Sequence, residues 1–368
     1  MKLFNMKTEL TQDFRSIVLD KRPLIDVRAP IEYEKGFFPH SVNLPLLNDE
    51  ERRLVGICYK EFGNTAAVAL GKKLIHPEIQ NERVKAWKTF AAMHPDAYLY
   101  CFRGGQRSQI SQMWLSESGI EMPRLKGGYK AFRNFLIQES ERISTEVNTL
   151  ILGGRTGSGK TILLNQLDNS IDLEGLAHHR GSSFGSFVNP QPSQIEFENS
   201  LAYELIHHEE AVHKHLVLEH EGRNIGKIYI PHGILSALRE GRLVILQTPL
   251  RERIDITFDE YVTQSLLAYE QAYAHEAEEQ WFQAVKLGLK RISKRLGSEL
   301  YIQIQSLLQE AYAHQKNSGE LEGHKIWIEI LLCRYYDPMY DYQIEKSEMP
   351  IVFRGDAQEV KAYMKSQE

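Results

Sequence analysis

The segment Gly154-Arg-Thr-Gly-Ser-Gly-Lys-Thr161 constrains the fold of this chain more than any other feature. It matches the pattern G-x-x-x-x-G-K-[ST] at every fixed position, and its context is a strand-like apolar run at 149–152 and a helix-like run at 162–167. A loop in this setting points backbone amides and a helix N-terminus at phosphate oxygens. We therefore predict that the loop binds phosphate within an α/β domain.

The predicted phosphate contacts come from the loop and from one arginine after the strand candidate at 244–247, and they are Gly154, Thr156, Gly157, Ser158, Gly159, Lys160, Thr161 and Arg251. Lys160 would neutralise the distal phosphate and Thr161 could hold Mg²⁺. Arg251 and Arg253 both follow that strand candidate. A guanidinium there suits a diphosphate, but an arginine in this position is equally compatible with a solvated helix start.

A metal ion would also need an acidic residue at a neighbouring strand end. Asp172, Glu219 and Glu221 are the candidates, although each is also compatible with an ordinary strand-end acid. Arg180 lies in a polar, glycine-containing segment at 178–185 that suggests a substrate-contacting loop or a plain surface loop, and Arg223 follows the second acidic segment. Mg²⁺ is thus expected as a possible ligand, with no certain metal site.

Cys101 ends an apolar segment, 97–100, and begins a loop that holds Arg103, Arg107 and two adjacent glycines. Glycines let the backbone curl so that several amides point at one atom, and nearby guanidinium charge favours the reactive thiolate. A buried, inert cysteine is the alternative interpretation. The loop composition favours a reactive thiol.

Composition indicates a water-soluble globular protein with room for two domains. The 368 residues are 42% hydrophobic and 25% charged, and no apolar run approaches the ~20 residues of a membrane span. Three dispersed cysteines are a poor disulfide framework, so we expect a cytoplasmic location. Residues 1–140 carry 21 Lys and Arg against 16 Asp and Glu, and the remainder carries 23 against 33.

Strand-like and helix-like runs alternate along the chain, which predicts doubly wound parallel sheets. Strands are expected at 23–27, 97–100, 147–152, 215–218, 243–247 and 351–354, and helices at 65–75, 82–93, 108–118 and 160–167. A charged helical connector at 134–146 marks the predicted boundary between domains 1–140 and 141–368. The region 254–310 is expected to be helical. Lys286, Lys290 and Lys294 recur at helical spacing, as in an RNA-binding stripe or a solvated face.

Residues 10–138 resemble the rhodanese (sulfurtransferase) family. The resemblance rests on Ile25-Asp26-Val-Arg28 through Gly36, His40 to Pro45, the loop from Cys101 to Arg107, and Leu125-Lys-Gly-Gly-Tyr129. It implies a rhodanese-like doubly wound sheet in the first domain. It also implies catalytic roles for Asp26, Cys101, Arg103 and Arg107, with Cys101 carrying a persulfide or perselenide.

The whole chain resembles the tRNA 2-selenouridine synthase family, in which a rhodanese domain precedes a P-loop NTPase-like α/β domain with a helical extension. The resemblance rests on 55–60, 172–185, 219–226 and 336–340. It implies replacement of sulfur by selenium in tRNA carrying 2-thiouridine at the wobble position. The co-substrates would be selenophosphate, from its own source, and geranyl diphosphate, without a permanent cofactor. The alternative is a sulfurtransferase fused to an ATP- or GTP-dependent kinase-like domain.

Overall fold

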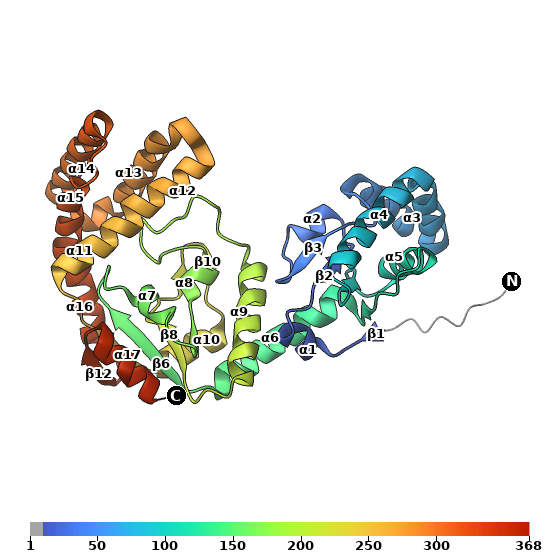
Figure 1. Cartoon of the computed structure of the whole chain (residues 1–368), viewed down its shortest axis with the longest axis horizontal. Coiled ribbons are helices and arrows are strands. Elements are labelled where there is room, and N and C mark those ends of the chain that lie inside the picture. Colours follow the sequence, from blue (N-terminus) through green and yellow to red (C-terminus); the bar gives the residue numbers. More distant parts are fainter. Residues whose placement is uncertain (1–9, 368) are drawn as a thin grey trace. The chain divides into compact units, whose positions relative to one another are not determined.

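Short apolar strands followed by helices build two parallel five-stranded sheets in this chain (Figure 1). The computed structural model describes residues 10–367. Two compact units divide the chain: the first runs to Arg142 and also contains Ser193–Glu210, and the second contains Ile143–Pro192 and Ala211–Glu368. No helix within residues 10–367 is long and apolar enough to cross a membrane.

The sheet of the first unit has the strand order β1-β5-β4-β2-β3, with all pairs parallel. Its strands are β1 (Leu10–Thr11), β2 (Leu24–Asp26), β3 (Ser41–Asn43), β4 (Tyr98–Tyr100) and β5 (Arg124–Leu125). Helices follow the strands, and they are α1 (Phe14–Leu19), α2 (Pro30–Tyr33), α3 (Asp49–Leu74), α4 (Pro77–Met93), α5 (Gln106–Glu117) and α6 (Gly128–Glu146). Ile25, Leu99 and Trp87 are fully buried in the core between sheet and helices.

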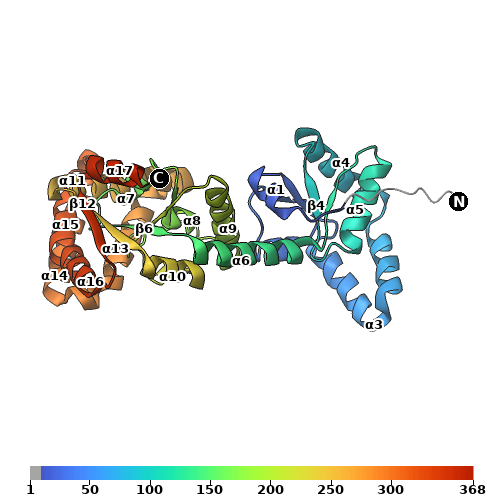
Figure 2. The same cartoon turned by 90° about the horizontal axis from the view of Figure 1, so that it is seen from below.

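Helix α3 begins earlier than the helix expected at 65–75. Asn48 caps its first turn by accepting from the amide of Glu51, whose carboxylate in turn accepts from the amide of Asn48. The helix bends sharply at Gly63, whose φ of 78° lies in the region that favours glycine. Figure 2 shows the resulting two arms. The expectation missed the first arm because glycines interrupt its pattern.

Helix α9 (Gln194–Glu210) belongs to the first unit, although the expected boundary assigned its residues to the second domain. It packs against α1. Asn199 donates to the carbonyl of Phe37 at 2.6 Å and accepts from Arg133 at 2.8 Å. Arg15 forms an ion pair with Glu209 at 2.8 Å. These contacts join segments far apart in the sequence, so no local pattern could reveal them.

The sheet of the second unit has the order β12-β11-β6-β8-β7, again with all pairs parallel. Its strands are β6 (Thr149–Gly154), β7 (Ser170–Ile171), β8 (Leu216–Glu219), β11 (Arg242–Leu246) and β12 (Ile351–Gly355). A separate antiparallel pair contains β9 (Asn224–Ile225) and β10 (Ile228–Tyr229). Among the helices on the sheet are α7 (Lys160–Leu164), α8 (Leu173–Leu176), α10 (His232–Glu240) and α17 (Ala357–Ser366).

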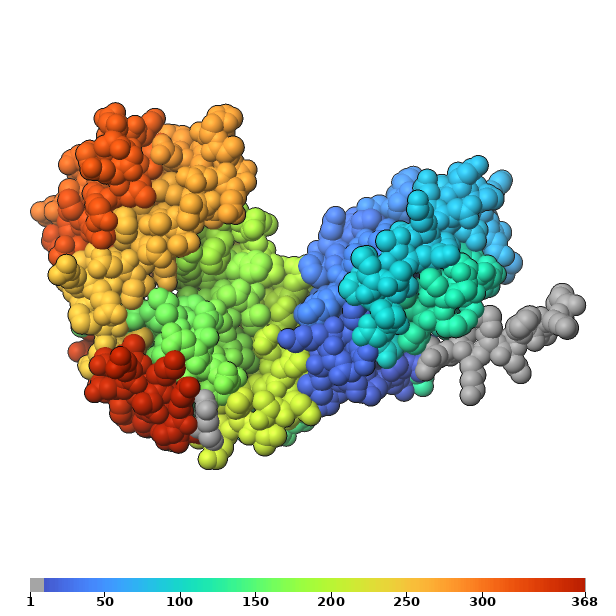
Figure 3. Space-filling view, viewed as in Figure 1, coloured from blue at the N-terminus to red at the C-terminus, as the bar shows by residue number. Residues whose placement is uncertain are grey.

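A helical layer follows β11, as the sequence predicts for residues 254–310. It contains α11 (Leu250–Phe258), α12 (Gln264–Tyr273), α13 (Ala277–Leu296), α14 (Ser298–Ser318), α15 (His324–Leu331) and α16 (Asp337–Lys346), with π-helical turns at Asp259–Thr263 and Leu332–Tyr336. Trp281, Ile304 and Trp327 are buried at its centre. Figure 3 shows the helices after residue 250 in yellow and orange, bordering the green segment that carries the phosphate loop.

Candidate functional sites

The predicted phosphate loop connects β6 to α7 with the expected geometry. Gly159 adopts a left-handed conformation, φ 80°, at the residue before the helix. Lys160 Nζ donates to the carbonyl of Gly154 at 3.1 Å, so its ammonium lies over the loop. Thr248 donates to the carbonyl of Ser158 at 2.9 Å, which fixes the loop to the segment after β11. The loop borders a cavity of about 450 Å³.

Most of the predicted phosphate-binding residues line this cavity, namely Gly154, Thr156, Gly157, Ser158, Gly159, Lys160 and Thr161. Arg251 is exposed and does not line it, because its helix turns the side chain outward. Two residues further on, Arg253 is 2% exposed and donates to the carbonyl of Thr156 at 2.9 Å. Its guanidinium also forms a two-bond ion pair with Asp337, at 2.5 and 3.0 Å. Arg253 therefore supports the loop, and its charge is already neutralised.

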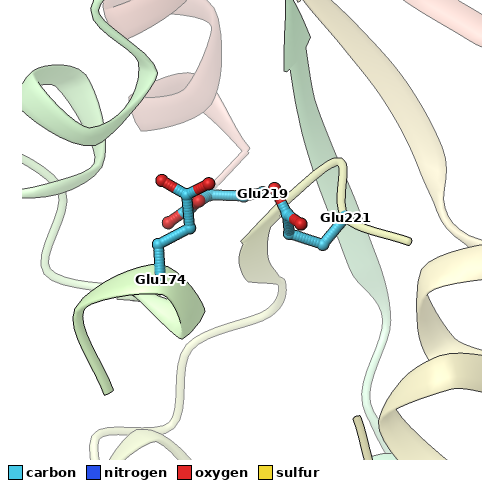
Figure 4. Close-up of side chains that lie close together, drawn as sticks. All are labelled: Glu174, Glu219 and Glu221. Carbon is cyan, nitrogen blue, oxygen red and sulfur yellow. The ribbon is translucent and has the colours of Figure 1, made fainter. Parts of the chain in front are cut away.

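Three glutamates meet beside the phosphate loop (Figure 4). Glu174 lies in α8, Glu219 ends β8 and Glu221 follows it, and one carboxylate oxygen from each lies within 4.8 Å of the others. Glu219 is fully buried, and neither of its oxygens has a hydrogen-bond partner among the described residues. A buried, unpartnered carboxylate beside two half-buried ones at this spacing suits a hard divalent cation such as Mg²⁺.

The pKa values of these glutamates are perturbed upward. Burial, together with the charge of Glu221, raises the pKa of Glu174 to about 9. Burial also raises the pKa of Glu219 well above its ordinary value, and Glu174 adds to that rise. The pKa of Glu221 is raised by burial as well, although the nearby Lys160 opposes the change. With its pKa near 9, Glu174 therefore holds a proton at neutral pH when no cation is bound.

The remaining predicted candidates, Asp172, Arg180 and Arg223, lie outside the glutamate cluster. Asp172 lines the cavity, but its carboxylate caps α8 by accepting from the amide of Gly175 at 2.7 Å. Arg180 lines the cavity and stacks over Phe187, 4.3 Å from the ring centre. Arg223 is exposed in the turn before β9 and does not line the cavity. Arg295, at the end of the lysine-rich helix α13, does line it.

Aromatic and apolar side chains also line this cavity. They are Phe187, Tyr261, Tyr335, Tyr336 and Met339. Tyr261 is held by a 2.8 Å hydrogen bond to Ser182. A smaller cavity of about 110 Å³ lies among helices α12, α13 and α15, and it shares Ser183 and Tyr261 with the larger one. The site therefore combines anion-binding residues with aromatic and apolar ones.

Cys101 lies directly after β4 and is 3% exposed. Its sulfur is 3.2 Å from the hydroxyl oxygen of Ser108 in α5. Its carbonyl oxygen accepts from the amide of Tyr129 at 2.9 Å, and the carbonyl of Phe102 accepts from Lys130 at 3.0 Å. The loop is thus anchored to the first turn of α6. Within residues 10–367, the amides of residues 102–106 donate no hydrogen bond, so they remain free for an anion.

A close approach of two backbones holds this loop in place. Gly104 and Gly128 both have left-handed φ values, 65° and 60°. A Cβ atom on Gly128 would clash with the carbonyl oxygen of Cys101 and the amide nitrogen of Gly104. The glycine pair at 127–128 therefore permits the packing that orients the cysteine loop.

The arginines and the aspartate that the sequence singled out have separate surroundings. Arg103 is exposed, beside the ring of Phe102. Arg107 forms a two-bond ion pair with Glu32, at 2.5 and 3.1 Å, and despite burial this arginine lowers the pKa of Glu32. Asp26 is fully buried and paired with Arg28 at 2.6 Å. Of the two arginines predicted from the loop, only Arg103 thus has no ion pair among the described residues, and the carboxylate of Asp26 accepts its hydrogen bonds from Arg28.

Sequence reasoning missed Arg124 in the first unit and Glu174 in the second. Arg124 is 3% exposed, donates to the carbonyl of Gly104 at 3.1 Å, and lies 3.4 Å from the Ser108 hydroxyl that contacts Cys101. Burial lowers the pKa of Arg124, and the charge of Cys101 opposes that effect. An isolated arginine before an apolar residue gives no local signal. For Glu174 the signal was its spacing of two residues from Asp172.

The fold and the two sites define a class: a protein with a rhodanese-like domain followed by a P-loop α/β domain. Family comparisons agree with it. Residues 9–135 match the family model described as "Rhodanese-like domain", and residues 147–368 match "tRNA 2-selenouridine synthase AAA domain". The chain belongs to the tRNA 2-selenouridine synthase family.

Several curated relatives are similar over nearly their whole length. A tRNA 2-selenouridine synthase of Sulfurovum sp. (strain NBC37-1) is 55% identical over 96% of this chain and 98% of the relative. That of Hydrogenovibrio crunogenus is 48% identical over 97% and 99%, and that of Shewanella frigidimarina 45% over 96% and 97%. The solved N-terminal domain of a putative ATP/GTP binding protein from Clostridium difficile 630 is 33% identical over 32% of this chain and 90% of that one, with a TM-score of 0.29.

Proposed function

We propose that this protein is an enzyme that replaces the sulfur of 2-thiouridine in tRNA by selenium, at the wobble position. Its relatives carry the name tRNA 2-selenouridine synthase and match it from end to end. The selenium donor in this proposal is selenophosphate. An S-geranylated nucleoside, made from geranyl diphosphate, is the intermediate.

The observation that carries the geranyl step is the mixed lining of the large cavity in the second unit. The amides of the phosphate loop and Lys160, which line it, suit a diphosphate. Tyr335, Tyr336 and Met339, which also line it, suit a hydrocarbon chain. The smaller cavity, which shares Tyr261 with the large one, is lined by Trp281 and Trp327. An amphiphilic anion such as a prenyl diphosphate has the polarity pattern of this cavity.

A Mg²⁺ ion held by Glu174, Glu219 and Glu221 would add charge next to the diphosphate. The orphaned oxygens of Glu219 support this assignment, because a buried carboxylate without partners is costly. Bound there, the ion would act as a Lewis acid toward the leaving pyrophosphate. Lys160 and the free loop amides would stabilise the same developing charge.

The proposed chemistry balances without an external oxidant or reductant. The thiocarbonyl sulfur attacks C1 of the geranyl group, a carbon–sulfur bond forms, and the carbon–oxygen bond breaks to release pyrophosphate. Selenium of selenophosphate, already at the oxidation level of selenide, then attacks C2 of the base. The C2–sulfur bond breaks to release geranylthiol, and water cleaves the selenium–phosphorus bond to release phosphate.

Cys101 and its loop are assigned to the selenium step. The free amides of residues 102–106 and the exposed Arg103 suit an anionic selenium donor. The buried Arg124, which donates to the carbonyl of Gly104, adds positive charge close to the sulfur of Cys101. In the step above selenium forms no bond to Cys101, so the role assigned to the thiolate and its loop is to bind and orient the selenium donor. We therefore expect Cys101 to be required for selenation and dispensable for geranylation.

The test is mass spectrometry of nucleosides from 2-thiouridine-containing tRNA after incubation with the protein. Parallel reactions contain geranyl diphosphate alone, selenophosphate alone, both, or ATP alone. We expect a geranylthio product with the diphosphate and a seleno product with both. Lys160→Met should lose geranylation, and Cys101→Ser should lose only selenation. An unchanged base in every reaction, with ATP hydrolysed, would instead favour the kinase-like alternative. Equal loss of both steps in Cys101→Ser would refute the division of labour.

A further inference from the structure

A groove in the first unit has no role in the chemistry above. It is a cavity of about 580 Å³ between the two arms of α3 and the start of α5. The bend at Gly63 brings the arms together, and a Cβ atom on Gly71 would lie 3.8 Å from Val55 of the other arm. The groove volume falls within the range of small-molecule and cofactor pockets.

The lining of the groove combines apolar side chains, called its floor below, with cationic side chains, called its walls. Ile110, Met113 and Trp114 of α5 contribute to the floor, and Val55 and Val68 of α3 complete it. Five cations line the walls: Arg52, Arg53, Lys60, Lys72 and Arg107. Glu32 is the sole carboxylate among the described lining residues.

Part of this positive charge is unpaired. Arg52 and Arg107 share Glu32, and Arg53 pairs with Glu50 at 2.6 Å. Among residues 10–367, neither Lys60 nor Lys72 forms an ion pair or a side-chain hydrogen bond. When the charges of Glu32 and Glu50 are subtracted, the five cations of the walls still leave a net positive charge, which is complementary to a polyanion.

Exposed aromatic side chains accompany these cations. Tyr59 lines the groove and is 58% exposed, and Phe62, at the tip of the first arm, is 71% exposed. Large aromatic groups in water next to lysines are costly unless a partner covers them. Aromatic rings between cations form the platform on which proteins stack the bases of single-stranded nucleic acid.

One end of the groove borders the segment that follows the cysteine loop. Gln106 and Arg107, which line the groove, directly follow the Cys101 loop, whose glycines end at Gly105. A strand bound along the groove would therefore bring a flipped-out base next to the cysteine loop. Sequence-specific RNA recognition uses single-stranded loops whose bases can be splayed out in this way.

We propose that the groove between the α3 arms and α5 binds a single-stranded RNA loop, with bases on Tyr59 and the apolar floor and phosphates on Lys60 and Lys72. The inference rests on the proposed function, since it locates the RNA partner of that activity. An isoprenoid chain would use the floor but not the lysines. The cationic walls therefore favour RNA.

The experiment compares RNA binding by full-length variants over a range of salt concentrations. The probe is an RNA hairpin with a uridine-containing loop, and a duplex of the same composition serves for comparison. Lys60→Ala/Lys72→Ala removes two phosphate contacts, so the slope of log K against log salt should fall by about 1.4. The matched control, Lys85→Ala/Lys88→Ala on α4, removes two exposed lysines outside the groove and should bind as the parent does.

A second pair of variants tests stacking. Tyr59→Ala should weaken hairpin binding at least about fivefold with an unchanged salt slope, and Tyr59→Phe should restore it. Wild-type affinity and slope in both the lysine and the tyrosine variants would overturn the proposal. The proposal would also be overturned if the lysine and tyrosine variants lost binding of geranyl diphosphate but bound the RNA hairpin as the wild-type protein does. A wild-type protein that binds no RNA at all would instead contradict the proposed function, which separates the two failures.

Discussion

The glutamate cluster beside the phosphate loop should make the folded protein less stable as pH rises through the neutral range. Burial raises the pKa of Glu174 to about 9 from an ordinary 4.5. For an acid with a raised pKa, the folded protein binds more protons than the unfolded chain between these two values. Stability is therefore highest below pH 4.5 as far as this group is concerned, and is lost as pH rises toward 9.

The magnitude follows from the linkage relation. One group loses on the order of 1 kcal/mol of stability per pH unit within that window, or roughly 3 kcal/mol between pH 6 and pH 8. At ~2–4 °C per kcal/mol for a domain of this size, the melting temperature should fall by about 6–12 °C. Glu174→Gln should reduce this dependence and stabilise the protein at pH 8, although the buried Glu219, whose pKa is also raised, keeps part of it.

Calorimetric unfolding at pH 6, 7 and 8, in chelator and then with Mg²⁺, measures the effect. Mg²⁺ should restore stability at pH 8 in the parent but much less in Glu174→Gln, because the ion replaces the protons. Glu240→Gln, which changes an exposed carboxylate outside the cluster, is the control and should keep the parent's pH dependence. A parent protein whose melting temperature does not fall with pH, or a Glu174→Gln variant that falls equally, would refute the reasoning.

Two further predictions concern the supports of the two loops. Arg253→Ala leaves Asp337 with only the longer ion pair to Arg155, at 3.6 Å, and should cost about 3 kcal/mol in the free energy of unfolding. The exposed Arg251→Ala should change it by less than about 0.5 kcal/mol. Denaturant titration distinguishes the two variants, and equal effects would contradict the assignment. Gly128→Ala forces a left-handed alanine against the cysteine loop and should cost about 1–3 kcal/mol. It should also change the alkylation rate of Cys101, and an unaltered rate and stability would show that the loop does not depend on that close approach.

Local motifs were the part of this molecule that the sequence could predict. The phosphate loop is a contiguous segment whose strand, glycines and helix all lie within about twenty residues, and all of its predicted loop contacts line one cavity. The cysteine loop is similarly contiguous. In both, residue type and spacing are sufficient because the backbone between neighbouring residues determines the geometry.

Residues that reach a site from elsewhere in the chain escaped prediction. Arg124 approaches the cysteine loop from β5. Arg253 was one of two arginines that the sequence placed near the phosphate loop, but the prediction selected Arg251. The pattern could not decide between them, because both precede an apolar residue by one to three positions and only Arg253 faces the core. The first arm of α3 had a usable signal, the Asn48–Glu51 capping box, which its glycines obscured.

Helix α9 has a consequence for how the protein is made. Synthesis from the N-terminus releases the strands of the first unit early, but α9 leaves the ribosome only after the phosphate loop has been translated. Arg133 and Phe37 therefore lack their hydrogen-bond partner Asn199 until α9 has been synthesised, more than sixty residues after Arg133. A fragment cut at residue 140 therefore lacks one of its own helices. Such interleaving also hinders exchange of either unit by simple gene fusion, so the two halves are expected to be inherited together.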